Sequence, residues 1–127
     1  MTVSSEVIAM ERAALDRSDK GDPNGFVEIS DPEVVYIDPS IDQPIYGLPA
    51  LKEYYRGFQN AGGRSGEMLN VTTLTAGDAI VLTFNYRNQS QPGQPALLWN
   101  ATEVYRRAGN SWRIIHTHWS LVKSGQV

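Results

Sequence analysis

The hydrophobic period of this chain changes once, near the middle, and no other feature restricts its fold as much. Up to Asn60, apolar residues recur about every 3.6 positions, as on one face of a helix. From Glu67 onward, apolar and polar residues alternate, as on the two faces of a strand. The chain is therefore predicted to begin with helices and to end with a sheet.

Glycine, proline and asparagine at the breaks in this pattern set the boundaries of the elements. Three helices are predicted over 3–19, 23–30 and 48–60, with one short strand over 34–37. Four long strands follow, over 67–75, 79–88, 96–107 and 112–123, joined by hairpins at 76–78, 89–95 and 108–111. This order predicts an α+β fold. We expect one domain over residues 1–127, with three N-terminal helices packed on one face of a strongly bent antiparallel sheet.

Composition excludes several classes of protein. The chain is 41% hydrophobic and has three Trp, six Tyr and three Phe, enough for a core, so it is not disordered. A net charge of −3, with no block of like charges, gives no basis for binding nucleic acid or an anionic membrane. No apolar run approaches the roughly 18 residues that cross a bilayer. The N-terminus lacks the apolar stretch of a signal peptide, so we expect a cytoplasmic protein.

Two parts of the sequence resemble known families. Residues 12–55 resemble the Δ5-3-ketosteroid isomerases without a gap, at Gly21-Asp22, Gly25, Val27, Asp38-Pro39, Gly47 and the run from Lys52 to Tyr55. Residues 103–107 and 112–120 resemble the SnoaL-like proteins, and are also similar to the association domain of calcium/calmodulin-dependent kinase II. All three families belong to the nuclear transport factor 2-like superfamily.

This resemblance implies a cone-shaped fold in which helices close a bent sheet around a pocket. It also implies a cofactor-free protein that binds a small apolar organic ligand. The implied activity is that of an isomerase, cyclase or dehydratase that moves a proton on an apolar cyclic substrate. The alternative is a non-enzymatic module, similar to the kinase association domain, that binds a ligand or joins subunits.

Asp38 is the first candidate catalytic residue. It follows the apolar run from Val34 to Ile37, so it is expected where a strand leaves the core at the mouth of a cavity. In the isomerases that the chain resembles, the matching aspartate is the general base that moves a proton between two carbons. The alternative is an ordinary turn, in which Asp38 bonds only its own loop.

The same isomerases hold a developing oxyanion with a tyrosine and a protonated acid. The matching positions here are Ala14, which cannot donate a hydrogen bond, and a residue near Glu103. Losing one such donor typically costs a factor of about 10² to 10³ in rate. Steroid isomerisation by the same arrangement is therefore not expected. Tyr55 matches a supporting tyrosine and could donate instead, or it could simply pack in the core.

The last predicted strand carries His116 and His118. Strict alternation places both on one face with Trp112, Ile114 and Ser120, and places Trp119 on the other face. The resemblance implies that the histidine face lines the cavity. The side chains expected to contact the ligand there are Tyr55, Leu82, Phe84, Tyr86, Trp99, Glu103 and Ile114.

Imidazole suits acid–base catalysis at neutral pH, so His116 and His118 are predicted to act with Asp38 as catalytic residues. Such a set would give turnover two limbs in its dependence on pH. Two alternatives remain: the histidines are satisfied core residues, or they hold a metal with Glu103 or Asp38. Because His-x-His is a weak motif, we expect no metal and no cofactor.

Trp119 is expected on the outer surface of the sheet. With Ile115 and Leu121 it would form an exposed apolar strip, and such a strip indicates a partner. In the superfamily that the chain resembles, two subunits commonly meet at this face. We therefore expect a homodimer through the outer sheet face, with Trp119 at the contact.

Overall fold

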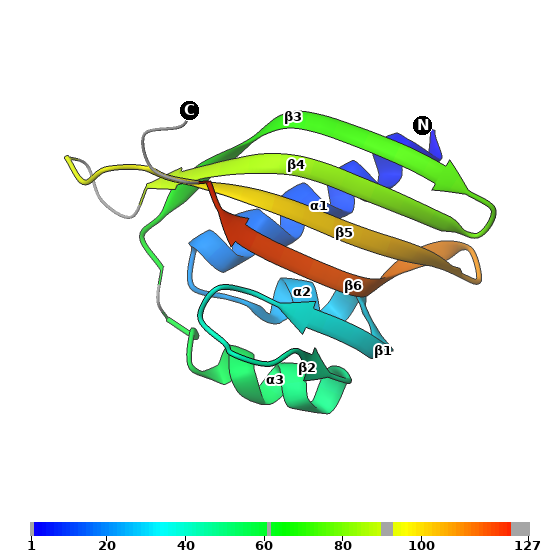
Figure 1. Cartoon of the computed structure of the whole chain (residues 1–127), viewed down its shortest axis with the longest axis horizontal. Helices are drawn as coiled ribbons and strands as arrows, with labels where there is room; N and C mark the ends of the chain where they lie inside the picture. Colours follow the sequence, from blue (N-terminus) through cyan, green and yellow to red (C-terminus); the bar gives the residue numbers. More distant parts are fainter. Residues whose placement is uncertain (1, 61, 90–92, 123–127) are drawn as a thin grey trace.

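The structure is a computed structural model, and it describes residues 2–60, 62–89 and 93–122. Within these ranges the first half contains α1 (Val3–Asp19), α2 (Asn24–Ile29), β1 (Ser30–Ile37), β2 (Ile45–Tyr46) and α3 (Leu48–Arg56). The second half contains β3 (Ser65–Ala76), β4 (Ala79–Gln89), β5 (Leu97–Ala108) and β6 (Ser111–Leu121). The long strands lie side by side across α1, and α3 lies near β1 and β2 (Figure 1).

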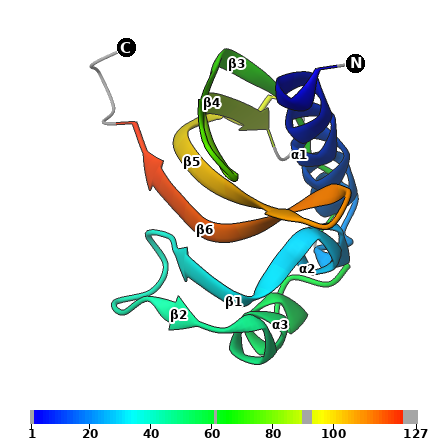
Figure 2. The same ribbon diagram turned by 90° about the vertical axis from the view of Figure 1, so that its right-hand side faces the viewer.

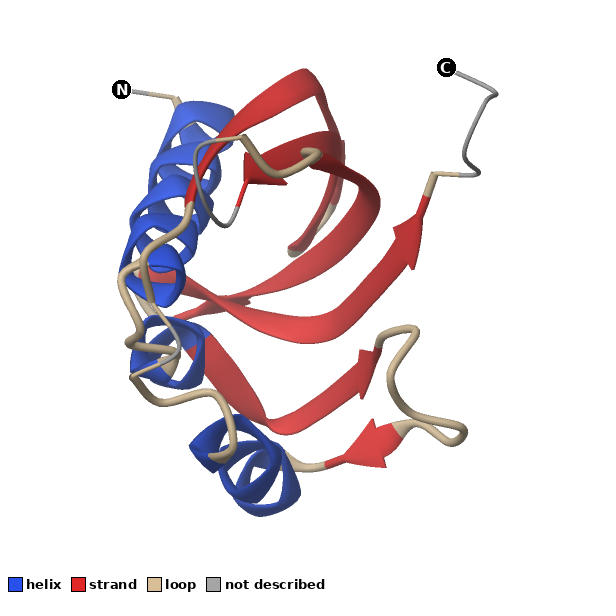
Figure 3. Ribbon diagram, turned by 90° about the vertical axis from the view of Figure 1, so that its left-hand side faces the viewer, coloured by secondary structure: helices blue, strands red, loops and turns tan. Residues whose placement is uncertain are grey.

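The strands form one sheet in the order β2-β1-β6-β5-β4-β3. Four pairings are antiparallel, but β1 and β6 run parallel, and the long segment from β2 to β5 makes the crossover that a parallel pair needs. The sheet is thus mostly antiparallel, as predicted, and the parallel pairing of β1 with β6 is a detail that the sequence did not specify. The sheet is strongly curved, and all three helices lie on one side of it (Figure 2 and Figure 3).

The α+β class and the order of the long elements are confirmed. The third helix ends at Arg56 instead of Asn60, because the chain then tightens into turns in which Phe58 N donates to Tyr55 O at 2.9 Å. The strand β1 begins at Ser30, four residues earlier than predicted, and the two-residue β2 was not predicted. Part of the predicted hairpin at 89–95, and Lys123, lie outside the described residues.

A β-bulge in β6 changes which side chains face the helices. Across β5 and β6, Tyr105 pairs with Ile114 whereas Val104 pairs with His116, so Ile115 is an extra residue. An extra residue reverses the alternation beyond it. Trp112 and Ile114 therefore face inward as predicted, but Thr117 and Trp119 follow them inward.

The prediction that His116 and His118 face the cavity was consequently wrong. His118 is exposed and His116 is half-buried on the outer side of the sheet, paired across the strands with Ile37 and Val35 of β1. The prediction that Trp119 lies on the outer surface was wrong for the same reason. Its ring packs edge-on against Phe84, with the ring centroids 5.7 Å apart.

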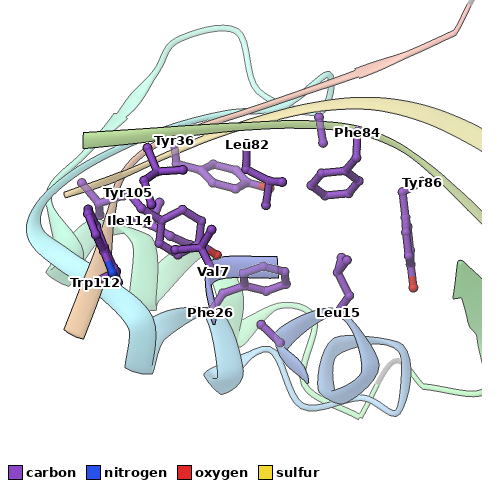
Figure 4. Packing of buried hydrophobic residues seen from close by; sticks show 14 of the residues in the cluster. Val7, Leu15, Phe26, Tyr36, Leu82, Phe84, Tyr86, Tyr105, Trp112 and Ile114 are labelled. Atoms are coloured by element: carbon purple, nitrogen blue, oxygen red, sulfur yellow. The ribbon is translucent and has the colours of Figure 1, made fainter. Parts of the chain in front are cut away.

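The hydrophobic core fills the space between the curved sheet and the helices. Val7 and Leu15 of α1 and Phe26 of α2 meet Leu82 and Phe84 of β4 (Figure 4). Burying side chains of this size contributes roughly 1.5–3 kcal/mol each. Tyr86 lies at one end of this cluster and Trp112 at the other (Figure 4). Among the described residues, no helix is both long enough and apolar enough to cross a membrane.

Candidate functional site

A cavity of about 180 Å³ lies beside the Tyr86 end of the core. Half of its lining residues are aromatic, and they come from helices, strands and the turn after α3: Phe26, Tyr36, Tyr54, Tyr55, Phe58, Tyr86, Trp99 and Trp119. Leu15 and Pro23 add further apolar surface. A cavity with such walls favours a flat or cyclic apolar body, since aromatic rings offer large, rigid contact surfaces.

Asp38 is the first polar feature of this cavity. Its Oδ2 accepts hydrogen bonds from the hydroxyls of Tyr36, at 2.7 Å, and Tyr54, at 2.6 Å. Its Oδ1 accepts one from the backbone N–H of Ser40, at 2.7 Å. A carboxylate has about four acceptor sites, so one site on Oδ1 remains for a ligand.

Local sequence explains how Asp38 reaches the cavity. Val34 and Tyr36 are buried in the second half of β1, and Asp38 continues their alternation just past the strand end. Ile41 N then donates to Asp38 O, at 3.4 Å, as the chain turns. Tyr54 comes from the inward face of α3, where it packs on Tyr36 with ring centroids 5.6 Å apart. Asp38 thus bonds both its own loop and a distant helix.

The two tyrosines remain hydrogen-bond donors throughout the neutral range. Burial, together with the neighbouring Asp38 carboxylate, raises the pKa of Tyr36 and of Tyr54 well above the usual value of 10.0. Burial and the nearby Glu103 likewise raise the pKa of Tyr55. The phenols therefore supply neutral O–H groups and do not compete with Asp38 as bases.

A second polar group, which shares no residue with the first, lines another part of the cavity. The Tyr86 hydroxyl donates to Oδ2 of the buried Asp19. Arg64, from the segment between α3 and β3, lies with its Nε 3.7 Å from Asp19 Oδ1. Asn88 continues the inward face of β4 beyond Tyr86, and its Oδ1 accepts from Trp99 Nε1 at 3.1 Å.

Glu103 lies outside this cavity, contrary to the expectation. Its carboxyl group is fully buried beside that of Glu11 on α1, and neither of its oxygens has a hydrogen-bond partner within the described residues. Glu11 accepts from the Tyr105 hydroxyl at 2.7 Å. Burial and the adjacent Glu11 raise the pKa of Glu103 well above its usual range, and burial raises that of Glu11 too.

The structure therefore divides the predicted site residues into three sets. Lining the cavity are Asp38, Tyr55, Tyr86 and Trp99. Buried elsewhere in the interior, and not lining it, are Leu82, Phe84, Glu103 and Ile114. On the outer side of the sheet are His116 and His118, which the bulge at Ile115 turns away. The proposed combination of Asp38 with a histidine in one cavity is thus wrong.

The alternative of a metal held by His116, His118 and Glu103 is also wrong, because the two histidines lie on the outer side of the sheet. Glu103 points into the interior whereas His118 is exposed on the opposite side of the sheet. Within residues 2–60, 62–89 and 93–122, no three or more histidine and acidic side chains gather closely enough to hold a metal ion.

Several cavity residues were not predicted: Tyr36, Ser40, Tyr54, Arg64, Asn88 and Trp119. For two of them the sequence pattern indicates a place at the cavity. Tyr54 belongs to the apolar stripe of the third helix, and Tyr36 stands two residues before Asp38 on one strand face. For Arg64 the pattern gives no such indication, because it lies in a glycine-rich segment whose path no periodicity describes.

A sequence model of the SnoaL-like domain matches residues 7–124 of the chain. The crystal structure of a candidate ketosteroid isomerase from Parabacteroides distasonis is 41% identical in sequence to this chain. The match covers 93% of this chain and 86% of that one, with a TM-score of 0.80.

More distant structures share the fold. A kinase II hub homology domain from Chlamydomonas reinhardtii is 21% identical, covering 96% of this chain and all of that one at a TM-score of 0.80. A nuclear transport factor 2-like protein from Pseudomonas putida is 22% identical, covering 99% and 92% of the two chains at the same TM-score. No curated protein matches the chain.

Proposed function

The chain belongs to the SnoaL-like domain family, and from that premise we propose that it is a cofactor-free enzyme that moves a proton on a small, largely apolar cyclic ligand. The isomerase, cyclase and dehydratase reactions of such a pocket share one step, the removal of a proton from carbon. The observation that carries the proposal is Asp38, a carboxylate held by two neutral tyrosines at the wall of an aromatic cavity.

In the proposed step, Asp38 Oδ1 takes a proton from a carbon next to the carbonyl group of the ligand. The C–H bond breaks, an O–H bond forms, and the electron pair moves to the carbonyl oxygen, giving an enolate. Asp38 then returns the proton to another carbon of the same ligand, so that isomerisation needs no further reactant. The bond from Ser40 N–H to Oδ1 holds the carboxylate in place during both transfers.

The enolate oxygen also needs a hydrogen-bond donor. Ala14, which matches the donor position of the isomerases, is buried and has no polar group. We propose that the hydrogen bond to the enolate oxygen comes instead from the hydroxyl of Tyr54 or Tyr36. When Asp38 is protonated, its hold on the Tyr36 and Tyr54 hydroxyls weakens, because hydrogen bonds to a charged acceptor are stronger than those to a neutral one. One hydroxyl is then available to the enolate.

A role only in joining subunits, which the word hub suggests for the hub domains, is less well supported than the proposed enzyme. Subunit contacts do not require a carboxylate with a vacant acceptor site inside a cavity.

We do propose a homodimer through the outer sheet face, but the argument no longer rests on Trp119. Small and β-branched side chains such as Thr83, Thr102 and Val104, which alternate with the buried residues of β4 and β5, lie on that face, and Trp119 has no part in it.

The proposed function is tested with cyclohex-3-en-1-one, a neutral single-ring ketone whose isomerisation to the conjugated enone is followed by absorbance. Asp38→Asn keeps the shape of the side chain but cannot accept the proton. We expect it to lower the rate at least about 100-fold. Circular dichroism should show an unchanged fold.

Asp42→Asn is the matched control, because Asp42 is exposed in the same loop and does not line the cavity. It should leave the rate within about two-fold of the wild type. Equal rates for the wild type and Asp38→Asn, or no turnover of this or related small cyclic ketones by the wild type, would contradict the proposal.

A further inference from the structure

We infer that Arg64 and Asn88 form an anchor for a carboxylate group on the ligand, so that the preferred ligands are small carboxylic acids. This inference rests on the proposed function in one respect only, namely that the cavity binds a small ligand. It adds the chemical class of that ligand, which neither the aromatic walls nor Asp38 specifies.

The first support is the set of hydrogen bonds that Arg64 does not make. Its Nη2 lies 3.5 Å from Ser18 O, a long contact, and its Nε is 3.7 Å from Asp19 Oδ1, beyond hydrogen-bond distance. Among the described residues, Nε is therefore buried without an acceptor. A guanidinium group has five N–H donors in a planar fork. This one lines the cavity, and within the described part of the chain only Nη2 has an acceptor, Ser18 O.

Asn88 adds donors to the same cavity, two residues along β4 from Tyr86, whose hydroxyl bonds the Asp19 carboxylate that pairs with Arg64. The indole N–H of Trp99 can only donate, so the Asn88 atom that meets it, at 3.1 Å, must be the amide oxygen. The amide nitrogen of Asn88, with its two N–H groups, has no acceptor among the described residues and can donate to a ligand. Tyr86 does not compete for that acceptor, because its hydroxyl already donates to Asp19.

The position of Arg64 is fixed by the backbone. Arg64 N donates to Asp19 O at 3.1 Å, and Asn60 N donates to Gly21 O at 2.8 Å, so both ends of this segment are fastened to the end of α1. A Cβ atom on Gly62 would collide with the backbone of Lys20, which shows how closely the segment packs. A preorganised donor loses little freedom when it binds a ligand.

The volume of the cavity limits the rest of the ligand. At about 180 Å³, it is little larger than the 150 Å³ cavities that hold one benzene molecule. A single ring, or a short carbon chain, therefore fits within it. The carboxylate would lie at Arg64 and Asn88, while the ring lies against the aromatic walls.

Asp19 does not cancel this anchor. Its carboxylate is buried and receives the Tyr86 hydroxyl on Oδ2, while Arg64 stands beyond hydrogen-bond distance of Oδ1. Asp19 therefore forms an ion pair with the Nε edge of the guanidinium group, while among the described residues Nη1 has no acceptor and Nη2 has only Ser18 O, which leaves terminal N–H groups for the ligand. Bonds from charged donors to carboxylates are about twice as strong as bonds between neutral groups.

The test measures binding by isothermal titration calorimetry of the full chain with three probes of nearly equal shape. Phenylacetate carries the carboxylate, phenylacetamide is its neutral counterpart, and phenethylamine carries a positive charge. We expect the wild type to bind phenylacetate at least about ten-fold more tightly than phenylacetamide, and phenethylamine most weakly.

Arg64→Gln should reduce the preference for the acid over the amide to about two-fold or less. Arg56→Gln is the control of equal charge change, because Arg56 is exposed on α3, paired with Glu53, and does not line the cavity. It should retain the full preference. If Arg64→Gln fails to fold, the comparison of probes on the wild type still decides the question.

Three results would overturn the inference: equal binding of acid and amide by the wild type, tighter binding of the amine, or binding of none of the probes. The first two leave the proposed function standing, since a neutral ketone can still react at Asp38. Conversely, a clear preference for phenylacetate with no proton transfer at Asp38 would support the anchor and contradict the proposed function.

Discussion

At the scale of single residues, two acids show how surroundings decide the role of the same functional group. Asp38 is half-buried and accepts three hydrogen bonds, which leave one acceptor site on Oδ1 open toward the cavity. Glu103 is fully buried, with no hydrogen-bond partner for either oxygen among the described residues, which favours its neutral form. The first is suited to take a proton, and the second to keep one.

This difference predicts how Glu103 affects stability. In the unfolded chain Glu103 loses its proton near pH 4.5, but in the folded protein burial keeps the proton on to a much higher pH. The folded state therefore binds more protons than the unfolded state above pH 4.5, so the free energy of unfolding falls as pH rises. The contribution of one such group is at most about 1.4 kcal/mol per pH unit.

Glu103→Gln removes this group while keeping its size. We expect urea unfolding between pH 5 and 8 to show a smaller decline for the variant than for the wild type, and greater stability of the variant at pH 8. Glu53→Gln, on the exposed face of α3, should leave the decline unchanged. Parallel pH curves for the wild type and Glu103→Gln would show that Glu103 is ionised in the folded protein.

The residue scale also shows which parts of the site the sequence could predict. The position of Asp38 at the cavity could be predicted, because a residue that follows four apolar residues of a strand lies where the strand leaves the core. Arg64 could not, since it reaches the cavity through contacts between a glycine-rich segment and the end of α1. Such contacts join residues far apart in the sequence and leave no periodic trace.

At the scale of elements, one inserted residue in β6 decides which side chains face the cavity. The sequence around it reads Trp112, Arg113, Ile114, Ile115, His116, and two adjacent isoleucines fit either phase of the alternation. Alternation before this pair could be predicted correctly, as Trp112 and Ile114 show. Beyond it the phase depends on whether Ile115 pairs with β5, which no property of the residue itself reveals.

Deleting Ile115 is predicted to be far more damaging than its half-buried side chain suggests. Without the extra residue, His116 and His118 would turn inward and Trp119 outward. We expect a loss of at least about 3 kcal/mol in the free energy of unfolding, measured by tryptophan fluorescence in urea. His118→Ala should change it by less than about 0.5 kcal/mol. A deletion variant as stable as the wild type would contradict the assignment of the bulge.

At the scale of the whole molecule, the curved sheet has two faces with different tasks. The inner face carries the core and the cavity, and Trp119 belongs to it. The outer face carries His116, His118 and Thr102. This division separates the proposed ligand site from the proposed subunit contact, so that each can be altered without the other.

The homodimer is tested with substitutions on the two faces. Thr102→Arg places a charged side chain at the centre of the outer face and should yield a monomer by light scattering. Trp119→Ala should leave the dimer intact but weaken ligand binding, because it removes part of the cavity wall. A monomeric wild type, or a dimer unaffected by Thr102→Arg, would contradict a contact through this face.

At the level of the reaction, the proposed function requires that the Asp38 carboxylate, held by two tyrosines that stay neutral, takes the proton from the ligand. The most direct test is the rate of isomerisation of cyclohex-3-en-1-one between pH 3 and 9. The raised pKa values of Tyr36 and Tyr54 exclude a limb from either tyrosine in this range. We therefore predict that the rate does not fall between pH 7 and pH 9, and that Asp38→Asn is at least about 100-fold slower than the wild type at each pH in that range. A fall in rate with rising pH that disappears in His116→Ala or His118→Ala would contradict the claim.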